Sequence, residues 1–184
     1  QMCIRDRITS LPLAYTLSRY SFRGKTIIES ILMIPFAMPP VALGALLLIF
    51  FTNTGIGILL NSLFNIVFEV PGLIVAQYIV ILPMMIKIVK SSFDLVDEEY
   101  DAVARTLGCS RLGVLVKVLV PMAKTGVLSA FILGFSRALG EFGASVTLAG
   151  ATRFKTETLP IAIYLALSSG ELSLTIALIA ILIF

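Results

Sequence analysis

The chain has 184 residues, of which 58% are hydrophobic and 14% charged, and its formal net charge is +3. Soluble domains carry about 25% charged residues, so this composition and a mean hydropathy of +1.03 indicate a membrane protein. Histidine is absent and Cys3 and Cys109 lie far apart, so the sequence does not support a zinc site, histidine-based catalysis or a disulfide framework. The small net charge also argues against a nucleic-acid partner.

The two ends of the sequence do not look like the ends of a domain. The stretch LPLAYTL, residues 11–17, resembles the last turns of a helix, whereas QMCIRDR, residues 1–7, neither continues that apolar pattern nor resembles a signal peptide. The final apolar run starts at Leu172, and its thirteen residues at about 1.5 Å each are too short to cross a bilayer. We therefore expect a domain over 11–184, a poorly defined or extraneous segment over 1–10, and truncation at both ends.

Three stretches, 27–51, 72–90 and 124–142, are long and apolar enough to cross a membrane as helices, for which about 20 residues suffice. Because only helices satisfy the backbone in such a chain, the sequence predicts an all-α, polytopic transmembrane bundle. Pro39 and Pro40 remove two backbone donors from the first stretch and predict either an ordinary kink or a break that lines a water-filled path. Two shorter apolar segments, 56–69 and 158–168, are expected as helices at the outer interface or as re-entrant helices.

Lysine and arginine predict the orientation of these spans, because short cytoplasmic loops carry an excess of positive charge. The 52–71 connection has no Lys or Arg, and the 143–171 connection has only Arg153 and Lys155. The stretch before the first span and the segment between the second and third spans hold most of them: Arg19, Arg23, Lys25, Lys87, Lys90, Arg105, Arg111, Lys117 and Lys124. These two segments are therefore predicted to be cytoplasmic.

The segment 97–121, between the second and third spans, is charged and amphipathic and predicts two short helices. The first, 98–107, has Glu98, Glu99 and Asp101 in its first turn, where the helix dipole favours acids, and it carries an apolar face: Tyr100, Val103, Ala104 and Leu107. Gly108 is expected to end this helix in the left-handed conformation, and Ser110 to cap a second helix that Pro121 ends.

Two other interpretations of this segment are an amphipathic loop on lipid head groups and a DNA-binding helix-turn-helix. The spans on both sides and the weakly basic second helix argue against DNA.

From Ala102 onward the spacing resembles the EAA motif of ABC-transporter membrane subunits, in which Glu-Ala-Ala, a glycine and a final Leu-Pro follow at fixed intervals. The corresponding positions are Ala102, Val103, Ala104, Gly108, Val118, Val120 and Pro121. Ala102 stands where the family has an acid, and Asp101 is one residue earlier. The resemblance implies that this helix pair docks in a groove of a cytoplasmic ATPase, with the coupling candidates Asp101, Ala102, Ala104, Gly108, Ser110 and Pro121.

The chain does not look like an ATPase itself. GKT at 24–26 lacks the upstream glycine of a phosphate-binding loop, because Arg19 stands in that place. The resemblance therefore implies a transport subunit that is not an enzyme and holds no cofactor, with ATP and Mg²⁺ used by the partner ATPase.

Four stretches resemble the permeases for molybdate and tungstate: LPLAYTLSRYSFRGK, IPFAMPPVALG, SRALGEFGASVTLAG and TETLPIAIYLAL. Sulfate and thiosulfate permeases share the third stretch more than the fourth. The resemblance implies the type I importer permease fold, a homodimer in the cytoplasmic (inner) membrane of a prokaryote, and an extracytoplasmic oxyanion-binding protein. A secondary transporter driven by an ion gradient is the alternative from another class, and it predicts paired broken helices and internal repeats.

Six residues are candidates for a gate or path: Pro39, Pro40, Arg137, Gly140, Glu141 and Gly143. Arg137 and Glu141 stand four residues apart on one predicted helix and are expected to pair, either as a structural ion pair or along the path. A membrane enzyme has no support, because no nucleophile lies at a suitable spacing from this pair. Small residues allow helices to approach closely, which is mainly a packing signal and also suits a dimer interface: Gly134, Ser136, Gly140, Gly143, Ala144 and Ser145.

Overall fold

The computed structural model describes residues 2–183, with side chains from residue 9 onward, and every regular element in that range is a helix. The chain packs as two units, one formed by the residues up to Ala37 with Ile81–Ser136, the other by Met38–Val80 with the residues from Arg137 on. Two helices, α5 (Val70–Asp94) and α9 (Lys124–Leu139), contribute to both units. The all-α fold class is confirmed.

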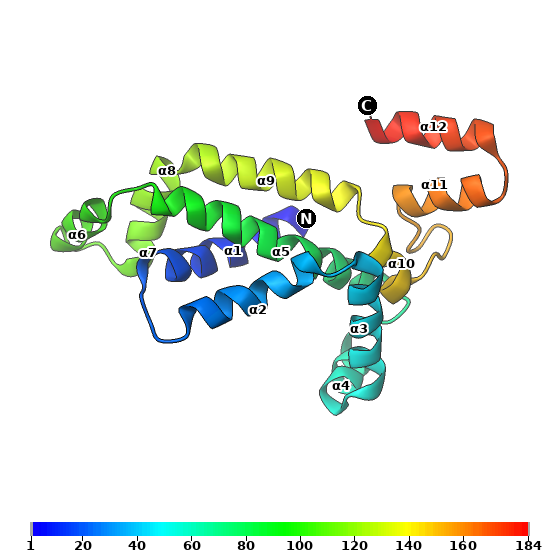
Figure 1. Cartoon of the computed structure of the whole chain (residues 1–184), viewed down its shortest axis with the longest axis horizontal. Coiled ribbons are helices and arrows are strands. Elements are labelled where there is room, and N and C mark those ends of the chain that lie inside the picture. The colour runs from blue at the N-terminus through cyan, green and yellow to red at the C-terminus, as the bar shows by residue number, and fades with distance from the viewer. Residues whose placement is uncertain (1, 184) are drawn as a thin grey trace. The chain divides into compact units, whose positions relative to one another are not determined.

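The first unit contains α1 (Met2–Arg19), α2 (Lys25–Ala37), the second part of α5 and most of α9, which run alongside one another in Figure 1. At one end lie α6 (Glu98–Thr106), α7 (Arg111–Val114), the π-helical turn η1 (Leu115–Leu119) and α8 (Val120–Met122). Its core is built around Phe93, Val114 and Leu119, all fully buried, and includes Ala14 and Tyr15 of α1.

The second unit contains α3 (Pro40–Asn53), α4 (Gly55–Phe64), the first part of α5, α10 (Gly143–Ala149), α11 (Leu159–Ser168) and α12 (Leu172–Ile183). Helices α11 and α12 form a hairpin (Figure 1). Thr54 ends α3 and caps α4, accepting a hydrogen bond from the Gly57 amide at 3.1 Å. An ion pair between Lys155 and Glu69 joins two connections of this unit.

The predicted spans are partly confirmed. Helix α5 covers the predicted 72–90 span, and among the described residues it alone is long and apolar enough to cross a membrane unaided. Two helix pairs raise the number to three if each is a single broken span: α2 with α3, and the 111–122 run with α9. The predicted kink or break in the 27–51 stretch is confirmed as a break, because α2 ends at Ala37 and α3 starts at Pro40.

The other predicted helices also have counterparts. The short apolar segments 56–69 and 158–168 form α4 and α11. The 124–142 stretch is helical only as far as Leu139. Helix α1 begins at Met2, so it extends through the segment that we expected to be poorly defined or extraneous; that expectation stays a prediction.

Close packing of α3 against α10 depends on glycine. A Cβ on Gly44 would lie 2.9 Å from Cα of Ala144, and one on Gly143 would lie 2.9 Å from the Val41 amide nitrogen. Most of the small residues that we interpreted mainly as a packing signal are buried within the chain itself: Gly134, Gly143, Ala144 and Ser145. Only Ser136 and Gly140 of that set are exposed.

Replacing Gly44 by leucine is expected to destabilise the second unit. The new side chain would overlap the backbone of α10, and overpacking of this kind costs about 1–3 kcal/mol. Thermal unfolding of the purified protein in detergent measures the loss. Gly55→Leu is the control, since a Cβ there meets nothing within 4 Å; equal melting temperatures for the two variants would contradict the prediction.

Candidate functional site

The helix pair at 97–122 is built by local hydrogen bonds. Gly108 adopts φ +86°, its amide donates to the Arg105 carbonyl at 3.0 Å, and the Cys109 amide donates to the Ala104 carbonyl at 3.0 Å. These two bonds form a Schellman motif, which satisfies the carbonyls at the end of α6. Ser110 caps the next helix, accepting from the Gly113 amide at 3.1 Å. The predicted glycine stop and serine cap are both confirmed.

The second helix of the pair continues past Pro121, contrary to our prediction. Pro121 has no N–H for the Lys117 carbonyl, and the preceding turn is π-helical, with the Val120 amide bonded to the Leu115 carbonyl. The helical run ends at Met122 and bends by 84° into α9. The proline therefore lies beside the bend and not at the helix end.

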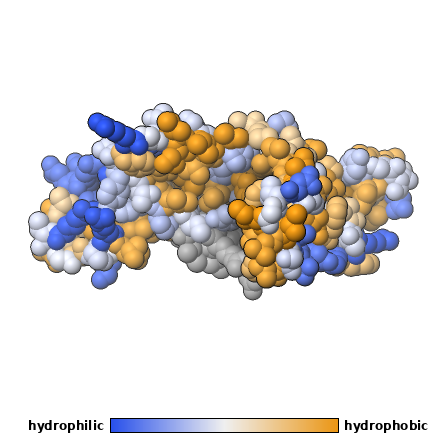
Figure 2. Space-filling view, turned by 90° about the horizontal axis from the view of Figure 1, so that it is seen from below, coloured by the Kyte–Doolittle hydropathy of each residue, from blue (hydrophilic) through white to orange (hydrophobic). Residues whose placement is uncertain are grey.

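The helix pair exposes several large apolar side chains, although Val114, Leu115 and Leu119 are buried. Ala104 is buried, whereas Tyr100, Val103 and Leu107 of the predicted apolar face are 52%, 57% and 80% exposed. Leu112 and Val116 of the second helix are also exposed, and we call these five side chains the α6–α7 apolar surface. In Figure 2 hydrophilic residues gather at the end of the first unit that carries α6. Large apolar side chains that remain exposed near charged residues are typical of an interaction site.

Three arginines attach this helix pair to the end of α1. Arg19 pairs with Asp101 at 3.1 Å between Nε and Oδ2. Nη2 of Arg105 lies 3.4 Å from the Tyr15 hydroxyl and 3.5 Å from that of Tyr20. These hydrogen bonds, the one to Tyr15 first, raise the pKa of the Arg105 guanidinium above its ordinary value. The Arg111 guanidinium lies 5.6 Å from the centre of the Tyr20 ring.

The structure separates the predicted coupling residues by exposure. Ala102, Gly108 and Ser110 are exposed, Pro121 is exposed beside the bend, and Asp101 and Ala104 are buried. The sequence analysis missed the roles of two residues in this region. Asp97 caps α6 by accepting from the Glu99 amide at 3.1 Å, and its position before two glutamates is a recognisable signal. Arg19 was used to predict orientation and to exclude a phosphate-binding loop, and no local pattern indicates its partner.

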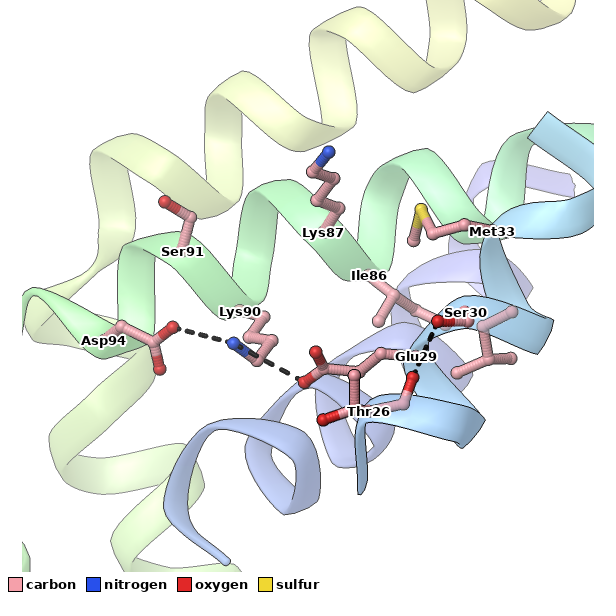
Figure 3. Close-up of a pocket in the computed structure, with 10 residues that line it drawn as sticks. Thr26, Glu29, Ser30, Met33, Ile86, Lys87, Lys90, Ser91 and Asp94 are labelled. Atoms are coloured by element: carbon pink, nitrogen blue, oxygen red, sulfur yellow. Dashed lines mark hydrogen bonds and ion pairs between the residues drawn. The ribbon is translucent and has the colours of Figure 1, made fainter. Parts of the chain in front are cut away.

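A cavity of about 630 Å³, lined by both polar and apolar side chains, lies between α2 and α5 in the first unit (Figure 3). Lys90 lies between two carboxylates, with its Nζ 3.0 Å from Asp94 Oδ2 and 3.6 Å from Glu29 Oε1. Ser18 of α1 donates to Asp94 Oδ1 at 2.6 Å. The lining holds two lysines, Lys87 and Lys90, and two acids, Glu29 and Asp94, so its formal net charge is zero.

The gate and path candidates lie together in the second unit. Arg137 Nη1 is 2.7 Å from Glu141 Oε2, which confirms the expected pairing. The two residues are not on one helix, however, because α9 ends at Leu139 and Glu141 follows the turn at Gly140. Glu141 is 1% exposed, and its Oε1 accepts the Ala144 amide at 2.9 Å, so it caps α10.

The break at the prolines adjoins this cap. A Cβ on Gly143 would lie 3.0 Å from Cβ of Pro40, which places the start of α3 against the start of α10. Pro39 precedes α3 as its cap residue. A path along these residues stays a prediction, and the contacts that the structure does show are those of close helix packing.

The apolar helices and their interrupted spans define an all-helical membrane protein. Comparison with known proteins then places it: the chain belongs to the family described as the binding-protein-dependent transport system inner membrane component, whose model matches residues 10–184.

Curated relatives are similar over most of the chain. A probable molybdenum ABC transporter permease protein of Haloferax volcanii is 41% identical over 166 residues, which cover 87% of this chain and 58% of the relative. The molybdenum transport system permease protein ModB of Escherichia coli K12 is 33% identical over 92% of this chain and 80% of the relative. The sulfate transport system permease protein CysT of Salmonella typhimurium is 30% identical over 91% of this chain and 61% of the relative. The chain thus spans less than two thirds of the Haloferax and Salmonella relatives.

Proposed function

We propose that the chain is the multi-pass permease subunit of an ATP-driven importer that carries molybdate or tungstate across the cytoplasmic membrane. The observation that carries this proposal is the α6–α7 apolar surface, which occupies the position where the family resemblance expects contact with an ATPase. The names of the relatives support the substrate, since molybdenum permeases match at 33–41% identity.

In this proposal the subunit performs no covalent chemistry. Two copies form the path, a binding protein delivers the oxyanion from outside, and ATP with Mg²⁺ is used by separate ATPase subunits. ATP can shift the inward and outward states only if the ATPase contacts the helix pair differently in each state. The exposed surface is available for such contacts, whereas a loop resting on lipid head groups would contact the membrane equally in both states.

A sulfate or thiosulfate importer is the second candidate, and the similarity to the sulfate permease favours it. A secondary transporter is the candidate from another class. Helix breaks at Met38–Pro39 and at Ala123 are a feature that it shares, but the transport family to which the chain belongs depends on a binding protein.

Competition for uptake separates these candidates. In vesicles containing the permease, the ATPase and the binding protein, we expect ATP-dependent uptake of labelled molybdate that tungstate inhibits and sulfate at the same concentration does not. Inhibition by sulfate as strong as by tungstate would favour the sulfate importer. Uptake in vesicles without the ATPase would favour the secondary transporter.

A further inference from the structure

The Arg19 guanidinium connects the end of α1 to the start of α6. Arg19 is the last residue of α1 and its side chain is only 6% exposed. Its Nε donates to Asp101 Oδ2 at 3.1 Å, and its Nη2 donates to the Val96 carbonyl at 2.8 Å. One planar side chain therefore holds both α6 and the connection that precedes it, which is the forked geometry that arginine provides and lysine does not.

The Asp101 carboxylate points into the protein and not toward a partner. Its side chain is 10% exposed, Oδ2 is engaged with Arg19, and Oδ1 is buried without a hydrogen bond among the described residues. The neighbouring Ala102, at the position where the resemblance expects an acid, is exposed. The acid of this chain is thus displaced by one residue, and that displacement turns it from the outer face of α6 to the inner face.

Breaking this pair would leave a buried charge without a partner, which is far more costly than losing an exposed ion pair. The other polar links between α6 and α1 are weaker. Arg19 Nη1 also lies 4.0 Å from Glu98 Oε1, but that carboxylate is 78% exposed, and the hydrogen bonds of Arg105 are long and its side chain is exposed. The Arg19–Asp101 pair is therefore the strongest polar link between these two helices.

We infer that Arg19 is a positioning residue for transport. Its ion pair with Asp101 makes α1 move together with α6 and the second helix when the ATPase displaces these two helices. This inference rests on the proposed function. Asp101 then serves as an internal anchor, and the contact with the ATPase is made by the exposed apolar side chains. Without the Arg19–Asp101 ion pair, the two helices would tilt on the ATPase while α1 stayed in place. ATP would then be hydrolysed without transport.

The test is the number of oxyanions taken up per ATP hydrolysed, measured in reconstituted vesicles with labelled molybdate, the ATPase and the binding protein. In the Arg19→Gln and Asp101→Asn variants this ratio should fall about tenfold, the factor expected for losing one charge-assisted hydrogen bond. ATPase co-purification and hydrolysis should persist. The Arg19→Lys variant should keep a higher ratio than Arg19→Gln, because lysine retains the positive charge. Arg23→Gln, which removes an exposed charge four residues after Arg19, is the matched control and should behave as wild type.

The double variant R19Q/D101N separates loss of the ion pair from misfolding, because it leaves no unpaired buried charge. Its ratio should be no lower than that of either single variant, since both substitutions remove the same link. The double variant Arg19→Cys, Asp101→Cys, made in a background with Cys3→Ser and Cys109→Ser, should recover the ratio when its two thiols are joined by a bifunctional maleimide.

Two results would overturn the inference. One is an Arg19→Gln ratio equal to that of Arg23→Gln. The other is a parallel loss of uptake, hydrolysis and ATPase co-purification that crosslinking does not reverse, because that pattern indicates a structural role only. Absence of ATP-dependent uptake by the wild-type protein would instead contradict the proposed function, and the inference with it.

Discussion

Replacing Gly108 by valine is expected to abolish coupled transport while leaving the spans inserted. Gly108 has φ +86°, and a β-branched residue in the left-handed region costs about 1–3 kcal/mol. The Schellman bonds of Gly108 and Cys109 would be lost, and the exposed side chains of α6 would no longer be held in register with those of the second helix. ATP hydrolysis and labelled molybdate uptake, measured on the same vesicles, should show hydrolysis with little or no uptake.

Gly170 provides a matched control for this prediction. It ends α11 with φ +78°, its amide bonds to the Leu167 carbonyl, and the Glu171 amide bonds to the Ala166 carbonyl, so it forms the same motif. No atom lies within 4 Å of a Cβ at either glycine. Gly170→Val should therefore carry the same local strain but retain coupled uptake. If Gly108→Val kept wild-type uptake, or if both variants lost it equally, the helix pair would not be a specific coupling element.

Replacing Glu141 by leucine is expected to cause the largest loss of stability. Glu141 is almost fully buried, pairs with Arg137 at 2.7 Å and accepts the Ala144 amide at 2.9 Å. Leucine removes the helix cap, whose loss costs about 0.5–2 kcal/mol, and it also leaves Arg137, whose side chain is 34% exposed, without its counter-ion. Glu141→Gln keeps an oxygen for the Ala144 amide, so its loss should be smaller. Thermal unfolding in detergent gives the comparison.

An exposed ion pair in the same unit is the control for Glu141. Glu69 and Lys155 have side chains 36% and 46% exposed, and surface pairs contribute about 0–1 kcal/mol. Glu69→Leu should thus lower the melting temperature much less than Glu141→Leu. If Glu141→Gln kept its melting temperature but lost uptake, the pair would act along the path; if uptake followed stability across the series, the pair would be structural.

The local features of the helix pair were predictable because neighbouring residues produce them. The glycine stop at 108 and the serine cap at 110 depend on hydrogen bonds within five residues, and both are confirmed. The proline break before α3 is local for the same reason, since a missing N–H acts on its own turn. Pro121 is the exception, because a π-helical turn accommodates the missing donor and lets the helix continue to Met122.

The sequence by itself determined the membrane class, the apolar helices and the amphipathic helix pair, because hydropathy and helical periodicity are properties of contiguous residues. Only the tertiary structure decided which way Asp101 points, since its partner Arg19 is 82 residues away and the pair forms only when α1 and α6 pack together. It likewise decided that Gly143 and Ala144 serve contacts with α3 inside the chain. A small residue permits a close approach in any direction, and the packing of the chain selects the neighbour.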